Sequence, residues 1–156
     1  MTATELLKED HQKALNLIGE LEAAAHQVGK NPTHTDAFNH LNELLLMHTF
    51  IEDKVFYRSM KEYDESRDLV REFRKRDQEF EKLLSHLSAL APNVEEFQET
   101  LSDLRVIIER HIDEEENELF PLAEELCEQG ELQDMGRTMR EMKYDSRTKA
   151  ATIWRK

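Results

Sequence analysis

The stretch LLMHTFIEDKVF, residues 45–56, has the apolar spacing of a helix that faces a protein core, but polar residues interrupt its apolar side. Apolar residues recur around His48 at intervals of three and four, which is typical of a core-facing helical surface. Glu52 follows His48 by four residues, so both side chains lie on that face, one above the other. Because an unpaired imidazole or carboxylate is costly in an apolar interior, both residues need a partner inside the fold.

The same spacing returns 63 residues later in IIERHIDEEENELF, residues 107–120. His111 and Glu115 are again four residues apart on an apolar stripe, while the other acidic residues of the run DEEENE belong to a solvated face. Two more apolar stripes each carry a polar residue at the middle, His11 on one and Asp77 on the other. Four predicted helices therefore place polar groups at matching depth.

A shared partner for these groups is most simply a cation. Imidazole nitrogen together with carboxylate oxygen suits iron, manganese or zinc, whereas an all-oxygen set suits calcium or magnesium. A glutamate from each of two opposing helices can bridge two metal ions while histidines bind at the ends. A metal-free bundle that serves as an interaction module is the alternative interpretation of the same residues.

The whole chain favours an all-α fold. Only four Gly and three Pro interrupt the 156 residues, and the apolar residues follow helical rather than alternating spacing. The expected helices cover residues 4–28, 35–63, 66–90 and 94–128. Thr2 and Glu5 form a capping-box pattern before the first helix, Gly29 closes that helix, and Pro121 should kink or break the fourth. Long helices with short connections predict an antiparallel up-down-up-down four-helix bundle.

The last part of the chain is expected to differ from the bundle. We place the bundle domain at residues 1–130, and a short helix followed by a basic tail at residues 131–156. Residues 137–156 hold seven basic and two acidic residues, a net charge of +5, which leaves −18 on the rest of the chain. Such a tail can pack on the acidic bundle, or it can dock a protein partner or a second copy of the chain. Both interpretations stay open.

Bulk composition argues against several classes of function. The 34 acidic and 21 basic residues give a net charge of −13, which disfavours nucleic acid or an anionic membrane as a partner. Cys127 is the only cysteine, so neither an internal disulfide nor a cysteine-based zinc site is expected. No segment approaches the roughly 18 apolar residues of a membrane-spanning helix, and the polar start MTATELLKEDHQ lacks a signal-peptide pattern. We expect a cytoplasmic protein.

The order of these motifs resembles the hemerythrin-like (HHE cation-binding) domain family. The resemblance spans residues 3–126 and includes the sequence ELFPL after the last histidine–glutamate pair. Its polar positions, in chain order, are His11, His48-x-x-x-Glu52, Asp77 and His111-x-x-x-Glu115. The resemblance implies an antiparallel four-helix bundle around two iron ions, a non-haem di-iron centre with an oxo or hydroxo bridge, carboxylate bridges and mostly histidine terminal ligands.

Carried over by position, the resemblance implies that His11 and His48 bind one iron and His111 the other, with Glu52 and Glu115 as bridges. Known roles of the family include reversible O₂ binding, sensing of oxygen, redox state or iron, and responses to nitric oxide or peroxide. We therefore expect a di-iron protein that binds or senses O₂, peroxide or NO. A di-iron enzyme that decomposes peroxide or oxidises Fe²⁺ is the alternative. The sequence does not separate the two, because it shows neither a substrate pocket nor a second catalytic motif.

The chain departs from the family pattern on its third helix. Asp77 stands where the family usually has a histidine, and Glu81 stands where the oxygen-carrying members have a second one. Both residues are expected to supply oxygen ligands, which gives a carboxylate-rich second site that favours the ferric state. Because a reversible O₂ carrier must return to the ferrous state, we expect sensing or binding rather than reversible O₂ carriage. The departure also leaves open a second site that holds another metal or none.

Overall fold

The computed structural model describes residues 1–25, 36–89 and 94–154, and every regular element in those ranges is helical. The elements are α1 (Ala3–Ala25), α2 (Asp36–Ile51), η2 (Glu52–Tyr57), α3 (Arg58–Met60), α4 (Arg67–Ala89), α5 (Val94–Glu114), η3 (Glu115–Leu119), α6 (Phe120–Leu126) and α7 (Gln129–Trp154). Two of them, η2 and η3, are π-helices that continue the preceding α-helix without a break. No helix in the described ranges is long and apolar enough to cross a membrane.

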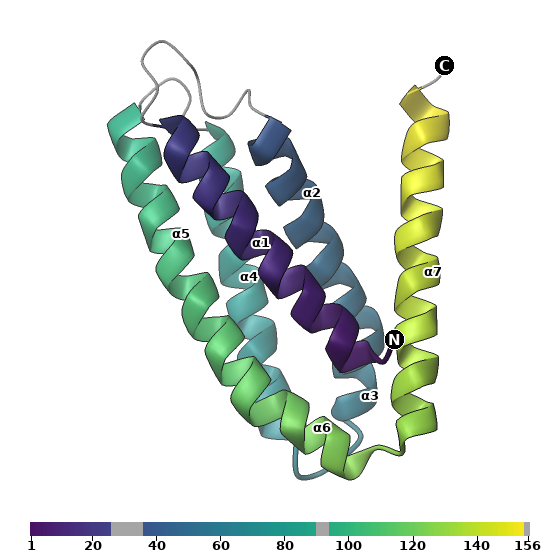
Figure 1. Ribbon diagram of the computed structural model, residues 1–156. Coiled ribbons are helices and arrows are strands. Elements are labelled where there is room, and N and C mark those ends of the chain that lie inside the picture. Colours follow the sequence, from purple (N-terminus) through teal and green to yellow (C-terminus); the bar gives the residue numbers. More distant parts are fainter. Residues whose placement is uncertain (26–35, 90–93, 155–156) are drawn as a thin grey trace.

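The first four long helical runs form the bundle. Figure 1 shows α1, α2 to α3, α4, and α5 to α6 running alternately up and down beside one another. The prediction of an all-α, antiparallel up-down-up-down four-helix bundle is confirmed. The observed bounds lie within a few residues of the expected ones where the chain is described. The expected end of the first helix at Gly29 lies outside the described residues.

A reciprocal capping box fixes the start of α1. The Glu5 backbone N–H donates to Thr2 Oγ1 at 3.3 Å, and the Thr2 backbone N–H donates to Glu5 Oε1 at 3.4 Å. These bonds satisfy two of the donors that the first turn of a helix leaves without an intrahelical partner. The pattern predicted from the sequence is therefore present, and it anchors the end of α1 from which His11 projects two turns later.

Two apolar clusters fill the bundle, and a polar layer separates them. One cluster, near the start of α1, includes Leu7, Ile51, Phe73 and Leu119. The other, toward the opposite end, includes Ala14, Leu45, Phe80 and Ile108. The polar positions that lie between these pairs along their helices are His11, His48, Asp77 and His111. The hydrophobic effect that folds the bundle thus brings the polar residues of four helices to one level.

Pro121 does not break the fourth helical run. The backbone stays in the right-handed helical region through Leu119 and Phe120, and Pro121 lies in the first turn of α6, immediately after η3. Proline is tolerated there because its missing N–H and its fixed φ suit the first turn of a helix. Of the expected kink or break, the break is therefore absent, and the backbone changes from α to π geometry just before the proline.

The C-terminal segment is longer than predicted. In place of a short helix and tail, α7 extends over 26 residues, and it lies against α1 and α2 (Figure 1). Leu132, Met135 and Met139 are buried in the same cluster as the start of α1. The division of the chain into domains at residue 130 stays a prediction.

Candidate metal centre

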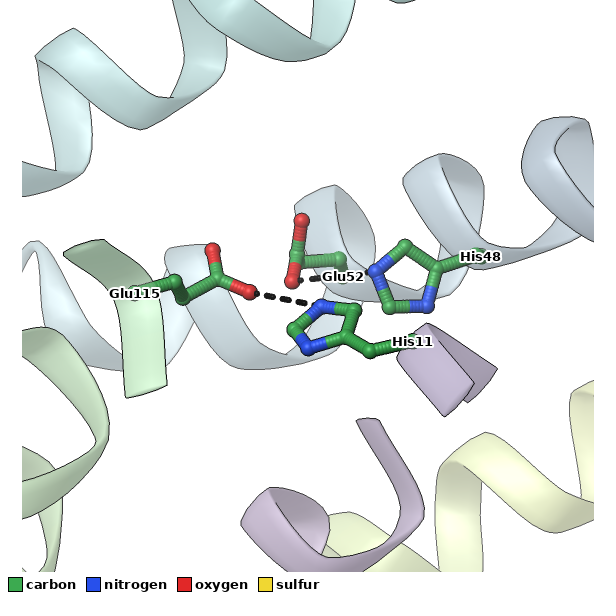
Figure 2. Close-up of side chains that lie close together, drawn as sticks. All are labelled: His11, His48, Glu52 and Glu115. Carbon is green, nitrogen blue, oxygen red and sulfur yellow. Dashed lines mark ion pairs between the residues drawn. The ribbon is translucent and has the colours of Figure 1, made fainter. Parts of the chain in front are cut away.

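Four helical runs bring their predicted polar residues into one buried layer. Figure 2 shows the first group, in which two imidazoles and two carboxylates converge: His11, His48, Glu52 and Glu115. One ligand atom from each residue lies within 4.8 Å of the others. None of these four side chains is more than 6% exposed. The group offers two nitrogen and two oxygen donors to one point in space.

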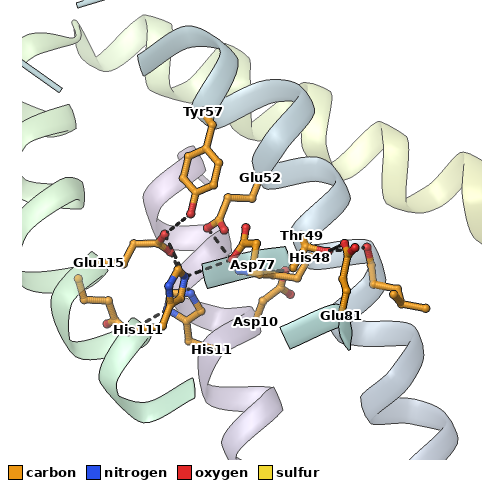
Figure 3. Close-up of polar contacts among 12 residues, drawn as sticks. Asp10, His11, His48, Thr49, Glu52, Tyr57, Asp77, Glu81, His111 and Glu115 are labelled. Carbon is orange, nitrogen blue, oxygen red and sulfur yellow. Dashed lines mark hydrogen bonds and ion pairs between the residues drawn. The ribbon is translucent and has the colours of Figure 1, made fainter. Parts of the chain in front are cut away.

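A second group adjoins the first and shares one residue with it. Glu52, Asp77 and His111 also place one ligand atom each within 4.8 Å of one another. Figure 3 shows Asp77, projecting from α4, and His111, from α5, beside the carboxylates of the first group. Because Glu52 belongs to both groups, the two candidate sites are neighbours rather than separate centres.

Glu115 also faces both groups. Its Oε1 lies 3.2 Å from His11 Nε2, and its Oε2 lies 3.3 Å from His111 Nε2. Each carboxylate oxygen is therefore directed at a histidine of a different group. This is the orientation that a carboxylate needs to join two cations.

The donor atoms of this layer are buried without hydrogen-bond partners. Among the described residues, these orphaned atoms include His11 Nε2, His48 Nε2, His111 Nε2, both oxygens of Glu52, both oxygens of Asp77 and Glu115 Oε1. Buried polar atoms are hydrogen-bonded in the great majority of native structures, so a convergent set of orphans needs an explanation. A mixed set of imidazole nitrogens and carboxylate oxygens fits iron, manganese or zinc. The residues present therefore fit a bound metal ion.

Carboxylates behind two of the histidines orient their rings. His11 Nδ1 lies 3.0 Å from Glu116 Oε2, and His48 Nδ1 lies 3.1 Å from Asp10 Oδ2. In the neutral form that can bind a metal, with the proton assigned to Nδ1, each ring donates outward and turns its Nε2 lone pair toward the centre. Metal-binding histidines commonly make this kind of outward hydrogen bond.

Aromatic rings hold the third histidine in place of a hydrogen bond. His111 packs edge-on against Phe73 and Phe80, with ring centroids 5.2 and 4.8 Å away. On the other side of the layer, Phe120 stacks on His11 with a centroid separation of 5.8 Å. Packing fixes these rings in position before any metal binds.

Three contributors to the site were missed from the sequence. Tyr57, which is fully buried, donates its hydroxyl to Glu115 Oε2 at 2.6 Å, and Asp10 and Glu116 orient histidines. Asp10 and Glu116 directly neighbour predicted ligands in sequence, but acidic residues are frequent throughout this chain. Tyr57 lies five residues after Glu52, outside the α-helical spacing of three and four, so periodicity gave no signal for it.

Glu81 does not join the layer. Its side chain is on the exposed side of α4, where Oε1 accepts a hydrogen bond from Thr49 Oγ1 at 3.1 Å (Figure 3). The structure therefore does not support the expected ligand role of Glu81, because its carboxylate is directed at Thr49 and lies outside both donor groups. Nearby arginines pair elsewhere: Arg74 contacts Asp53 at 2.7 Å, and Arg76 contacts Glu114.

The electrostatics of the layer reflect unbalanced buried charge. Burial, reinforced by repulsion from Glu52, raises the pKa of Asp77 well above its usual value. Burial alone would lower the pKa of His48, but the carboxylates of Glu52 and Asp10 raise it to about 10. Burial likewise opposes ionisation of Glu115, yet the neighbouring histidines bring its pKa well below the usual range. Protons therefore supply the positive charge in the metal-free layer.

Comparison with known proteins agrees with this geometry. The sequence model of the Hemerythrin HHE cation binding domain matches residues 2–123, most of the chain and all of the bundle's polar layer. The chain therefore belongs to this family. No curated protein and no solved structure matches it. The chain is thus a member of a cation-binding family, and its polar layer contains the clusters that could hold a metal ion.

Proposed function

We propose that the polar layer holds a non-haem di-iron centre and that the protein binds or senses O₂, peroxide or NO. The observation that carries the proposal is the position of Glu52 and Glu115 between the histidine pair His11 and His48 on one side and the single histidine His111 on the other. A single metal would not need a carboxylate shared by two donor groups. In this assignment His11 and His48 serve one metal, while His111 and Asp77 serve the other.

The choice of iron rests on the donor types and on the family. Imidazole and carboxylate donors together also suit manganese and zinc, so metal identity is the part of the proposal that experiment must establish. A bound iron pair would supply redox chemistry and an open coordination position for a small ligand. The carboxylate Asp77, in the place of a histidine, favours the ferric state, which supports sensing over reversible O₂ carriage.

The protein's own residues limit what can reach the centre. All six donors are at most 6% exposed. A cavity of about 960 Å³ lies beside α1 and α2, but none of the six donors lines it. A small diatomic molecule or peroxide therefore fits this burial better than a larger organic substrate.

Tyr57 supplies a proton next to the proposed centre. Its hydroxyl donates to Glu115 Oε2, and burial together with repulsion from Glu115 raises the pKa of the phenol well above its usual value. The phenol therefore stays protonated and holds the carboxylate in one orientation. A carboxylate held from behind in this way keeps its remaining lone pairs directed at the two metal positions.

The test is spectroscopic. Iron-loaded protein is reduced without oxygen, and O₂, peroxide and NO are added in separate experiments while the ultraviolet–visible spectrum and the ligand concentration are followed. A new spectrum at about one equivalent of ligand supports binding or sensing. Sustained loss of peroxide over many equivalents would instead establish the alternative, a peroxide-decomposing enzyme. No spectral change with any of the three would refute the proposal.

A further inference from the structure

We propose that Lys143, on α7, is a positioning residue for His48, so that docking of α7 tunes the metal centre. The proposal rests on the proposed function for its metal readout, but it concerns a part of the chain beyond the matched residues 2–123. Lys143 acts through Asp10 and touches none of the six donors directly. It connects the C-terminal helix to the polar layer of the bundle.

A continuous set of contacts runs from α7 to the centre. Lys143 Nζ donates to Asp10 Oδ1 at 2.5 Å, and Asp10 Oδ2 lies 3.1 Å from His48 Nδ1. The other nitrogen of the ring, His48 Nε2, lies 3.4 Å from Glu52 Oε2 within the donor group. Figure 3 shows Asp10 beside His48 on the outer side of the layer. Three helical runs thus meet at one carboxylate.

Burial makes the contact between Lys143 and Asp10 different from a surface ion pair. The Asp10 side chain is 2% exposed, and that of Lys143 is 18% exposed. By contrast, Lys13 and Glu9 form a pair on α1 whose side chains are 53% and 48% exposed. An exposed pair contributes little, whereas removing one partner of a buried pair leaves a charge without compensation.

The carboxylate of Asp10 is held at both oxygens by residues from different helices. The two contacts fix its rotation, and that rotation fixes the plane of the His48 ring. If Lys143 is removed, Oδ1 loses this partner and a buried negative charge remains. Because a buried charge without a partner is costly, the Asp10 side chain should turn toward solvent or take up a proton. Either change weakens its hydrogen bond with His48 Nδ1.

The packing of α7 delivers Lys143 to this position. Met135 and Met139 are buried against the bundle, and Lys143 follows them at the same spacing of four residues, on the same face of the helix. At Gly136, a Cβ would overlap the Met1 carbonyl oxygen, so the helix backbone lies directly against the start of α1. The position of Lys143 is therefore coupled to the docking of the whole helix.

The experiment compares Lys143→Met with Lys143→Arg, and uses Lys13→Met as a matched control on a lysine outside the contact set. One readout is the rate at which zinc-loaded and iron-loaded proteins release metal to a chelator. The other is the Nδ1–H proton signal of His48 in metal-free and zinc-loaded protein, which is assigned by its loss in His48→Gln. Circular dichroism confirms that each variant is folded.

We expect Lys143→Met to release metal about tenfold faster, because loss of such an outer contact commonly costs 10–100-fold in affinity. The Nδ1–H signal should shift and exchange faster with water. Lys143→Arg should retain both properties, as should Lys13→Met. Gly136→Ala, which keeps the lysine but displaces α7, should resemble Lys143→Met. That variant also tests the proposal if Lys143→Met does not fold.

Wild-type release rates and an unchanged Nδ1–H signal in Lys143→Met would overturn the inference. This outcome is distinct from failure of the proposed function, in which the wild-type protein itself would hold no metal. If the wild-type protein holds no metal, the Nδ1–H signal of His48 in the metal-free wild type and Lys143→Met decides whether Lys143 positions His48.

Discussion

Asp77 is the residue at which the cost of a metal-free centre is clearest. Both of its oxygens are buried without hydrogen-bond partners, and its closest charged neighbours include the carboxylates of Glu52 and Glu115. Burial, together with this repulsion, raises the pKa of Asp77, so that a proton relieves both costs in the metal-free protein. A cation would relieve it more completely, because it would serve several carboxylates at once.

Replacing Asp77 should therefore affect one of the two metal positions. Asp77→Ala should lower metal occupancy at the His111 position by about half or more and spare the position between His11 and His48. Metal content per chain, measured with the spectrum of the loaded protein, checks this. Glu81→Ala is the matched control, because Glu81 lies one turn farther along α4 and bonds Thr49. Equal metal content and identical spectra in wild type and Asp77→Ala would show that Asp77 is not a ligand.

The raised pKa of His48 predicts how the stability of the metal-free protein depends on pH. Its pKa is raised from 6.5 to about 10 in the folded chain, so its contribution to stability is complete below pH 6.5 and is lost as pH rises toward 10. The free energy of unfolding in urea should fall by a few kcal/mol over this interval. His48→Gln should flatten the slope, and His86→Gln, at an exposed position, should leave it unchanged. Equal slopes in wild type and His48→Gln would contradict this.

Tyr57 should matter for stability as well as for the site. Tyr57→Phe removes only the hydroxyl, which donates a hydrogen bond to Glu115. The loss of this buried bond should lower the unfolding free energy of the metal-free protein by about 1–3 kcal/mol. Tyr63→Phe is the control, since Tyr63 bonds Glu131 at the surface and should change stability by less than about 0.5 kcal/mol. Equal effects of the two substitutions would show that the buried bond to Glu115 contributes nothing.

Single residues also show how far the sequence predicts the site. A polar residue on an apolar stripe is conspicuous, so the sequence predicted a shared buried position, and the structure places these residues in one buried layer: His11, His48, Glu52, His111 and Glu115. The polar neighbours that orient them could not, because an acidic residue on a solvated face has the same appearance in the sequence whether or not it turns inward.

At the level of elements, the π-helices explain a contact that periodicity misses. Both begin at a glutamate of the centre, η2 at Glu52 and η3 at Glu115. A π-turn closes its hydrogen bond over five residues, so the residue five positions later returns to the inner face. Tyr57 and Phe120 reach the centre in this way. The sequence predicts continuous α-helix there, because the π geometry is set by the layer that the helices must build together.

The length of α7 was underestimated for a related reason. A short helix and a tail were expected at residues 131–156, and Gly130 and Gly136 both weaken helix propensity locally. Burial of Leu132, Met135 and Met139 outweighs that weakness. At Gly136 the small residue is also required, since the helix backbone approaches the start of α1 too closely for a side chain.

Replacing the two glycines of α7 by alanine should therefore change the stability of the protein in opposite directions. Gly136→Ala should destabilise the protein by about 1–3 kcal/mol, because a Cβ would overlap backbone atoms of Met1 and Thr2. Gly130→Ala should be neutral or stabilising by up to about 1 kcal/mol, since nothing lies within 4 Å of its Cβ position. Urea unfolding of both variants measures the difference. Equal stability of the two would mean that α7 does not dock as described.

For the molecule as a whole, the two apolar clusters fill the bundle on either side of the polar layer, so we expect the bundle to fold without metal. Any ligand that binds only the folded state adds stability by mass action, about 3 kcal/mol at a free concentration about 100 times its Kd. The acidic bundle, with its net charge of −18 outside residues 137–156, also favours attraction of cations. Fold, layer and charge thus agree on a metal-binding protein.

The most direct test of this account is the iron content of protein purified from iron-replete cells. We expect about two iron ions per chain in the wild type, and close to none in a His48→Leu/His111→Leu variant that keeps its helical circular dichroism. Less than about 0.3 metal ions per chain in a fully helical wild-type protein would contradict it, because a preformed site of this kind should fill when iron is plentiful.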